Sequence, residues 1–376
     1  MSIPRLSPTD TQVNLSNSIL KYFGLPLIHD SFQPLDELLA KNPDRRICLF
    51  LFDGFGKYIQ RHLRQFCPFM NDHQRFDMEA VYPPTTVAAT TALLSGRYPI
   101  ETGWLGWTQY FRKSNLYVEM FSGKLEGTDN RYVSGPKPAD ILTYRSIVDM
   151  INDRLGNGSA RDIKGFNCLD EKKCPSAGLF FEEVEKTIRD TSHNRFTYAY
   201  WAEPDHSLHM EGINSEAVRK SVTVIDRCVA EICRRNPEVL FLFIADHGHV
   251  AQSFIDIRNY PDFCETLEDS REPRFSIESR FATFFVKPDK HDAFKTAFHR
   301  HFASNFELYD RAQIYDEHVF GWGTPHPDIE DFIGDYTLIA TSNKALWDGF
   351  NYNGLIWGHA GATKEERILS LGVANA

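Results

Sequence analysis

The sequence predicts an α/β fold with a mostly parallel central sheet and helices on both faces. Apolar runs of strand length occur at 47–53, 195–202, 239–246, 281–287 and 336–341. Stretches with apolar residues at helical spacing alternate with these runs, near 143–155, 181–191, 215–235 and 290–302. Such alternation is typical of parallel sheets, whose crossover helices cover both faces. We therefore expect one α/β domain over residues 1–376.

Two stretches interrupt this alternation, at about 105–140 and 250–335, with aromatic residues and prolines in segments such as GWLGWTQYF and VFGWGTPHPD. We expect them to be insertions that form a cap over a functional site. Aromatic side chains in and near the cap can stack on a nucleoside or aryl group, although most such residues serve packing. These aromatic residues are Trp104, Trp107, Tyr110, Phe111, Tyr260, Trp322 and Trp357.

Composition limits the class of protein. A net charge of -10 argues against a protein that binds nucleic acid polymers or anionic membranes. No apolar stretch approaches the length of a membrane span, and the N-terminus lacks a signal-peptide pattern, so we expect a cytoplasmic protein without a membrane partner. Seven cysteines without paired spacing predict reduced thiols rather than a disulfide framework.

Three apolar runs end on, or lead into, an aspartate. ICLFLFDG contains Asp53, FTYAYWAEPD ends at Asp205, and VLFLFIADHGH contains Asp246. The carboxyl ends of parallel strands open into the crevice where ligands bind. We therefore expect these three carboxylates to converge on one site.

Histidines near these aspartates complete a set of metal ligands. Asp205 and His209 stand four positions apart, so both side chains share one face if a helix begins there. His247 directly follows Asp246, where the chain leaves the strand before a glycine. His359, flanked by glycine and alanine in WGHAG, is weaker by spacing alone but supplies a sixth ligand. Six ligands favour two sites of three, with an open position at each, as in catalytic zinc sites.

The segment VYPPTTVAATTALLSGRYP predicts a helix that begins at Thr85 or Thr86 and continues to about Leu94. An N-cap is the ordinary role of a threonine at this position. Beside divalent metals, however, its hydroxyl can lose a proton and attack a phosphoryl centre, while the free N–H groups of the helix stabilise negative charge.

Five blocks together resemble a known family. They are FLFDGFG, YPPTTVAATTALLSGRYPIETG, EPDHSLH, ADHGH and GHAGATKEE, and their order and spacing agree with the alkaline phosphatase superfamily, nucleotide pyrophosphatase/phosphodiesterase-like branch. The resemblance covers most of the chain. It implies a metal-dependent hydrolase of phosphate esters that works through a phospho-threonine intermediate on a two-metal site. The implied substrate is a small phosphate ester, with nucleotides among the candidates.

The resemblance also implies roles for individual residues. Thr86 matches the nucleophile. One metal would be held by Asp53, Asp246 and His247 with Thr86 as the fourth ligand, and the other by Asp205, His209 and His359. The mixed nitrogen and oxygen donors favour Zn²⁺, with Mn²⁺ as an alternative.

One departure from the family pattern leaves the substrate open. The phosphodiesterase branch usually carries an asparagine three positions after its nucleophile, whereas this chain has Ala89. A phosphomonoesterase, a phosphoryl-transfer mutase and a non-catalytic metal-binding homologue therefore remain as alternatives. A sulfatase is disfavoured, because Cys174-Pro175 is not followed by the arginine of the sulfatase motif. The sequence does not predict the oligomeric state.

Overall fold

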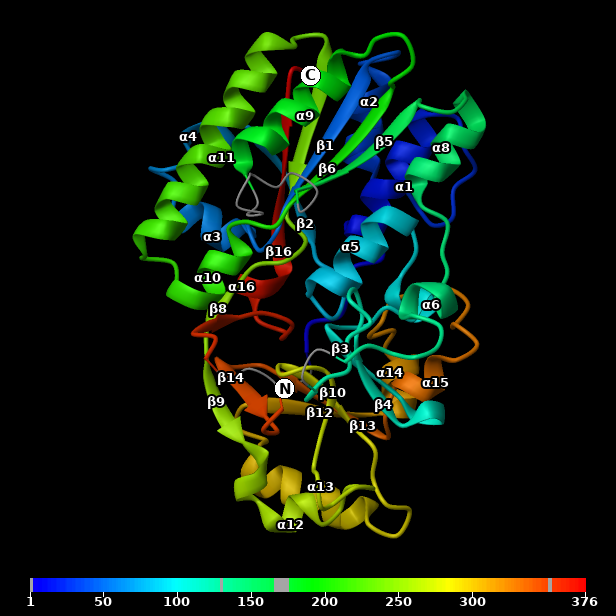
Figure 1. Cartoon of the computed structure of the whole chain (residues 1–376), viewed down its shortest axis with the longest axis vertical. Helices are drawn as coiled ribbons and strands as arrows, with labels where there is room; N and C mark the ends of the chain where they lie inside the picture. Colours follow the sequence, from blue (N-terminus) through cyan, green and yellow to red (C-terminus); the bar gives the residue numbers. More distant parts are fainter. Residues whose placement is uncertain (1–2, 129–130, 166–175, 351–353) are drawn as a thin grey trace.

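The computed structural model describes residues 3–128, 131–165, 176–350 and 354–376. A six-stranded sheet forms the upper half of the molecule in Figure 1. In spatial order its strands are β2 (Gln74–Glu79), β16 (Ile368–Ala374), β7 (Val239–Ile244), β1 (Arg46–Phe52), β6 (Phe196–Trp201) and β5 (Ala160–Lys164). Four adjacent strands run parallel to one another: β7, β1, β6 and β5. β16 runs antiparallel to both of its neighbours, β7 and β2. The predicted mostly parallel sheet is confirmed.

Helices flank this sheet in two groups (Figure 1). The first group is α1 (Gln12–Tyr22), α2 (Gln33–Ala40), α5 (Thr86–Ser95) and α8 (Ile147–Leu155). The second is α4 (Pro68–Asp72), α9 (Ala177–Arg189), α10 (Asp205–Glu211) and α11 (Glu216–Arg235). Every residue of β7 is buried, and so is every residue of β1 after the first, as expected of strands covered on both faces.

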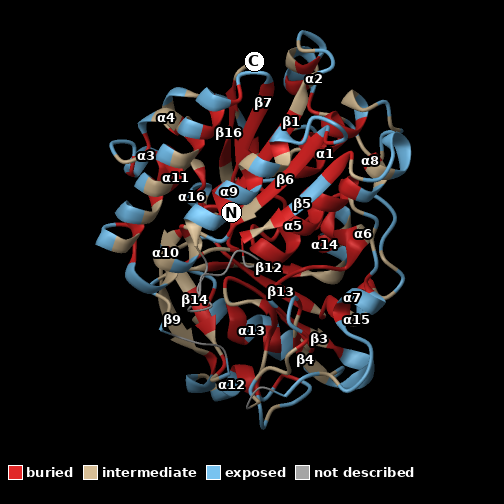
Figure 2. Cartoon of the chain, turned by 45° about the horizontal axis from the view of Figure 1, so that its top comes forward, coloured by how far each residue is buried: buried red, intermediate tan, exposed pale blue. Residues whose placement is uncertain are grey.

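The long helix α11 shows how the sequence pattern produces this packing. Its buried residues recur at intervals of three or four positions, as in Val218, Val222, Ile225 and Val229. This spacing puts them on one face of a helix. Figure 2 shows exposed residues along its other side. Ser215 caps the helix by accepting a hydrogen bond from the backbone of Val218.

A second six-stranded sheet forms the lower half of the molecule (Figure 1). Its strands, in spatial order, are β12 (Phe306–Asp310), β13 (Tyr336–Ala340), β11 (Phe281–Phe284), β10 (Ser276–Glu278), β3 (Thr108–Phe111) and β4 (Leu116–Glu119). All neighbouring pairs are antiparallel. The runs at 281–287 and 336–341 therefore form strands as predicted, but their expected place in the parallel sheet was wrong.

The burial of these two strands explains the difference. In β13, Leu338 and Ala340 pack into one apolar cluster with α12 (Pro261–Cys264) and α13 (His291–His301), whereas Ile339 packs into another with α14 (Arg311–Asp316) and α15 (Ile329–Phe332). An antiparallel sheet that is covered on both faces gives the same continuous apolar runs as a parallel one. The apolar pattern alone cannot separate the two.

The predicted insertions at about 105–140 and 250–335 supply most of this second sheet. The remaining short elements are α3 (Lys57–His62), α6 (Pro99–Thr102), η1 (Arg112–Ser114), α7 (Pro138–Ile141), β8 (Val250–Ala251), β9 (Ser253–Asp256), η3 (Ile257–Asn259), β14 (Lys344–Trp347), β15 (Trp357–Gly358) and α16 (Lys364–Arg367). Among the described residues, no helix is long and apolar enough to cross a membrane. The five described cysteines are free thiols, and Cys168 and Cys174 lie outside the described residues.

A fully buried ion pair joins the second sheet to the C-terminal part of the chain. Arg280, in the turn between β10 and β11, binds both carboxylate oxygens of Glu366 at 2.7 and 2.9 Å. Nη2, which binds Glu366, also donates to the backbone oxygen of Ser342, and Nη1 donates to the backbone oxygen of Lys344. Glu366 in turn accepts a hydrogen bond of 2.7 Å from the backbone of Gly361. This network fixes the turn that carries His359.

We expect Arg280→Met to lower the free energy of unfolding by about 3–5 kcal/mol, because it leaves the Glu366 carboxylate buried without its cation. Urea denaturation monitored by circular dichroism measures this change. The double variant Arg280→Met/Glu366→Gln also removes the unpaired charge of Glu366, so it should recover part of the lost free energy of unfolding. A single variant within about 1 kcal/mol of the unmodified protein would contradict the prediction.

Candidate active site

The three predicted aspartates converge at the carboxyl ends of β1, β6 and β7. Asp53 directly follows β1, Asp205 begins α10 after β6, and Asp246 follows β7. The backbone ties the segments together, because the N–H of Asp205 donates to the carbonyl of Asp53 at 3.1 Å. Gly54 has a φ of +69°, and its N–H donates to Asp246 Oδ1 at 3.0 Å. A side chain at Gly54 would meet the His249 ring at 2.7 Å, so only glycine fits.

Two of these carboxylates, Asp53 and Asp246, are poorly compensated by the described protein groups, whereas His209 and His249 hold the pKa of Asp205 below its usual value despite its burial. Burial, followed by the charge of Asp205, raises the pKa of Asp53 well above its usual value. Burial, followed by the charge of Asp53, does the same to the pKa of Asp246. Asp246 Oδ2 is buried and has no hydrogen-bond partner among the described residues. Tyr200 donates to Asp53, but one hydroxyl does not balance these two carboxylates. The cluster calls for bound positive charge.

Thr86 lies beside these carboxylates, at the first position of α5. The predicted helix is confirmed, since α5 spans Thr86–Ser95. The Thr86 hydroxyl oxygen lies 3.3 Å from Asp53 Oδ1 and 3.2 Å from His247 Nε2. The first N–H groups of the helix lack intrahelical acceptors and give this end a partial positive charge. A nucleophilic hydroxyl, a carboxylate and an imidazole thus meet at a helix N-terminus.

The predicted histidines present ring nitrogens to the carboxylates. His209 Nε2 lies 3.4 Å from Asp205 Oδ1, and His247 Nε2 lies 3.4 Å from Asp53 Oδ1. The other ring nitrogen, Nδ1, faces a backbone carbonyl in both residues. In His209 this is the carbonyl of Trp357, at 2.7 Å, and in His247 it is that of Gly248, at 3.1 Å. Because a carbonyl only accepts, Nδ1 carries the hydrogen in the neutral ring and Nε2 keeps a lone pair that faces the site. Such a second hydrogen bond is typical of metal-binding histidines.

His359 comes from the loop after β15 and completes the predicted set. Its Nε2 lies 3.9 Å from Asp205 Oδ1, and its ring stacks on that of His247 with the centroids 3.8 Å apart. Burial, followed by the neighbouring His247 and His209, holds the pKa of His359 well below its usual value. Burial also lowers the pKa of His209, but the charge of Asp205 outweighs it and the pKa rises to about 9. A neutral His359 is free to donate its lone pair.

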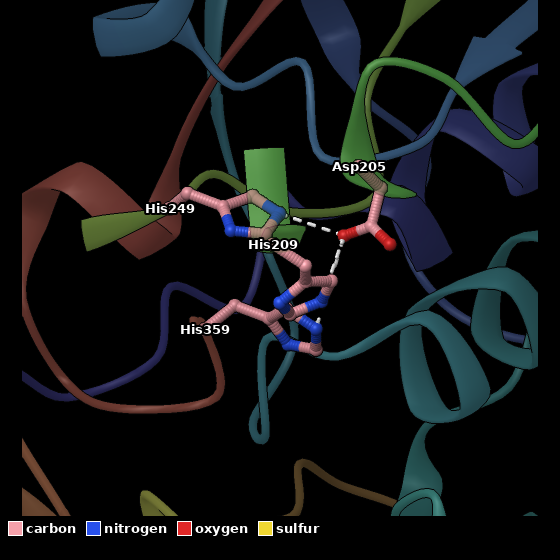
Figure 3. A group of neighbouring side chains, drawn as sticks. All are labelled: Asp205, His209, His249 and His359. Atoms are coloured by element: carbon pink, nitrogen blue, oxygen red, sulfur yellow. Dashed lines mark hydrogen bonds and ion pairs between the residues drawn. The ribbon is translucent and has the colours of Figure 1, made fainter. Parts of the chain in front are cut away.

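His249 is a further histidine of the site that was not predicted from the sequence, and Figure 3 shows it pointing at Asp205 together with His209 and His359. His249 Nε2 lies only 2.7 Å from Asp205 Oδ1. Burial lowers the pKa of His249 to about 4, against the opposing effect of Asp205. A signal was present in ADHGHV, because side chains two positions apart in an extended segment lie on the same face. The ring centroids of His247 and His249 lie 5.4 Å apart.

Two groups of side chains could hold metal ions, since within each group the ligand atoms all lie within 4.8 Å of one another. The groups are Asp205, His209, His249 and His359, and Asp53, Asp205 and His247. Asp246 belongs to neither group, although its Oδ2 lies 3.5 Å from His247 Nε2. Nitrogen and oxygen donors, a partnerless buried carboxylate oxygen and crowded negative charge all fit divalent ions.

Solved structures with the same fold share little sequence with this chain. Murine ectonucleotide pyrophosphatase/phosphodiesterase 5 matches with a TM-score of 0.61 and 15% identity over 88% of each chain. An inactive threonine-to-alanine variant of that protein, in complex with AMP, matches with a TM-score of 0.60 and 14% identity over 88% of each chain. Phosphonoacetate hydrolase from Sinorhizobium meliloti 1021, in complex with phosphonoformate, has a TM-score of 0.65 and 16% identity over 88% of this chain and 91% of that one.

No curated protein matches the sequence at a significant level. The family model of type I phosphodiesterase/nucleotide pyrophosphatase, however, matches residues 47–340. This segment contains Asp53, Thr86, Asp205, Asp246 and His247, and the match extends over most of the chain. The chain belongs to the type I phosphodiesterase/nucleotide pyrophosphatase family, within the alkaline phosphatase superfamily.

Proposed function

We propose that this protein is a two-metal hydrolase of small phosphate esters, similar to a phosphodiesterase or nucleotide pyrophosphatase. The observation that carries the proposal is the position of Thr86, whose hydroxyl lies at a helix N-terminus between Asp53 and His247. The complexes of the murine enzyme variant with AMP and of phosphonoacetate hydrolase with phosphonoformate support a small phosphate or phosphonate ligand.

The proposed metal ligands follow from the donor atoms at each aspartate. Asp53, Asp246 and His247, together with Thr86, would hold one ion, and Asp205, His209 and His359 would hold the other. Zn²⁺ suits this mixture of nitrogen and oxygen donors, and Mn²⁺ is the alternative. When bound, the ions supply positive charge that stabilises a deprotonated hydroxyl and the oxygens of a phosphoryl group.

His249 has a different proposed role. Its nitrogen lies 2.7 Å from Asp205 Oδ1, whereas the corresponding distances for His209 and His359 are 3.4 and 3.9 Å. The short distance is that of a hydrogen bond. Two ligands of one tetrahedral ion, each about 2.0–2.1 Å from it, are farther apart than this. We assign His249 as a positioning residue that orients the Asp205 carboxylate.

The residues of the chain then perform a two-step reaction. Asp53 orients the Thr86 hydroxyl, whose oxygen attacks phosphorus after its proton passes to solvent, and the leaving-group oxygen takes up a proton from solvent. A Thr86 oxygen–phosphorus bond forms as the bond to the leaving-group oxygen breaks, and the free N–H groups at the start of α5 stabilise the developing charge. Water then attacks the phospho-threonine, which releases the phosphate product and restores the hydroxyl.

A phosphomonoesterase is the second candidate, and Ala89 is the observation that favours it. Ala89 is fully buried in the apolar cluster that contains Val87, Ala88 and Tyr98. It therefore offers no side-chain donor to a phosphoryl oxygen at the position where the phosphodiesterase branch usually has asparagine. Transfer to an acceptor other than water, as in a mutase, would use the same first step.

Hydrolysis assays test the proposal. Metal-free protein is reloaded with Zn²⁺ or Mn²⁺ and given p-nitrophenyl phosphate, bis-p-nitrophenyl phosphate or p-nitrophenyl thymidine 5′-monophosphate. We expect release of p-nitrophenol that depends on added metal, and the ratio of monoester to diester rates separates the two candidates. If no substrate is cleaved while two ions are bound, the protein is a transferase of narrow specificity or a non-catalytic metal-binding homologue.

A further inference from the structure

A fourth carboxylate reaches the start of α5 from the second sheet. Glu278, the last residue of β10, accepts two hydrogen bonds on Oε1, from the Thr85 hydroxyl at 2.7 Å and from the backbone N–H of Trp107 at 2.8 Å. Thr85 directly precedes Thr86. The carboxylate is therefore bonded to the residue next to the proposed nucleophile, and its second oxygen, Oε2, takes part in neither hydrogen bond.

The electrostatic surroundings also place Glu278 at the site. The pKa of Glu278 is raised above its usual value, because burial outweighs the hydrogen bonds from Thr85 and Trp107 and the charges of His247 and His209, which lower it. Both imidazoles belong to the candidate active site. The Glu278 carboxylate thus interacts electrostatically with two histidines of the candidate active site.

The backbone that carries Glu278 is held in a strained conformation. Ile277 has a φ of +84°, which is unfavourable for a β-branched residue. Its carbonyl lies against Gly106, where an added Cβ would approach the Ile277 oxygen to 2.7 Å. Two residues after Glu278, the Arg280 guanidinium is fixed by Glu366. Strain that is held by several neighbours in this way is concentrated at functional positions.

A charge count shows what this carboxylate does, provided that the proposed two-metal function is correct. Asp53, Asp205 and Asp246 leave one net positive charge beside two divalent ions, and Glu278 cancels it. A neutral site attracts a dianionic monoester less than a positive site does, and the loss for a monoanionic diester is half as large. We propose that Glu278 selects substrates by charge, disfavouring dianionic phosphate monoesters and favouring monoanionic phosphodiesters.

The exposed aromatic residues next to Glu278 fit a diester. Trp107, whose backbone Glu278 binds, has a side chain that contacts Phe121 with the ring centroids 6.2 Å apart. Both residues are about half exposed, at 48% and 53%. They offer apolar surface beside the site for the second ester group, which a monoester lacks.

Glu278→Gln tests the proposal, because it removes the charge and keeps an oxygen acceptor for Thr85 and Trp107. The measurement is kcat/KM for p-nitrophenyl phosphate and bis-p-nitrophenyl phosphate at about pH 8, where a phosphate monoester is dianionic. We expect the monoester-to-diester ratio to rise about tenfold, which corresponds to about 1.4 kcal/mol. Glu278→Ala should shift the ratio in the same direction. Glu265 is exposed in the segment between α12 and β10, so Glu265→Gln should leave the monoester-to-diester ratio unchanged.

Binding and metal content give readouts that do not depend on turnover. Calorimetry should show that Glu278→Gln binds inorganic phosphate about tenfold more tightly than the unmodified protein does, and that the gain for dimethyl phosphate is smaller. Both proteins should hold two ions per chain. Unchanged ratios and affinities in a folded, metal-loaded variant would overturn the proposal for Glu278 alone. Failure of the unmodified protein to cleave either substrate would instead overturn the proposed function.

Discussion

Thr86→Ala is expected to reduce kcat by about 10⁴-fold or more, because it removes the oxygen that forms the bond to phosphorus. The hydroxyl is small and lies at the first position of α5, so its loss opens little space and breaks no helical hydrogen bond. Helix position, fold and the ligands from three aspartates and three histidines stay in place. Steady-state kinetics, circular dichroism and metal analysis on the same preparation measure these effects separately.

Thr86→Ser is the matched variant, since it keeps a hydroxyl oxygen at the same place. It should retain a measurable part of the activity, and acid quenching with a radiolabelled phosphate ester should trap label on the unmodified protein but not on Thr86→Ala. Near-normal turnover in Thr86→Ala would rule out this residue as the nucleophile. Loss of both ions in that variant would show that it acts mainly in holding metal.

The parts of the fold that sequence predicted correctly are those with a local signal. β1, β6 and β7 follow from short apolar runs that lead into Asp53, Asp205 and Asp246, and the start of α5 follows from two prolines before a threonine pair. The antiparallel second sheet has no such signal. Its strands β11 and β13 are buried on both faces, so that their apolar runs resemble those of the parallel sheet.

The site shows the same division between local and long-range information. Each predicted ligand and Thr86 stands in a short motif that can be recognised by itself, and the structure brings all of them to one edge of the central sheet. Glu278 could not be found in this way, because its partner Thr85 is 193 positions away in the sequence. The pairing of β10 with β3 places Glu278 beside Trp107 within the second sheet, and the hydrogen bond from Thr85 joins Glu278 to the start of α5.

His359→Ala is expected to lower the metal content from two ions per chain to about one, since the proposed ligand set Asp205, His209 and His359 would lose a nitrogen donor. The remaining site, at Asp53, Asp246 and His247, does not use this ring as a ligand. Metal analysis after equilibration with a weak chelator measures the occupancy. The midpoint of thermal unfolding in excess metal should also fall, because an ion that binds only the folded state stabilises it.

His206→Ala is the matched control, because His206 is exposed on α10 next to Asp205 and belongs to neither group of candidate ligands. It should keep two ions and an unchanged unfolding midpoint. Asp205→Asn removes the carboxylate of the same proposed ligand set and should likewise leave about one ion per chain. Two fully occupied ions in His359→Ala would contradict its assignment as a ligand. If Asp205→Asn loses one ion in the same experiment, the error is confined to His359, and His249 would become the third ligand beside Asp205 and His209.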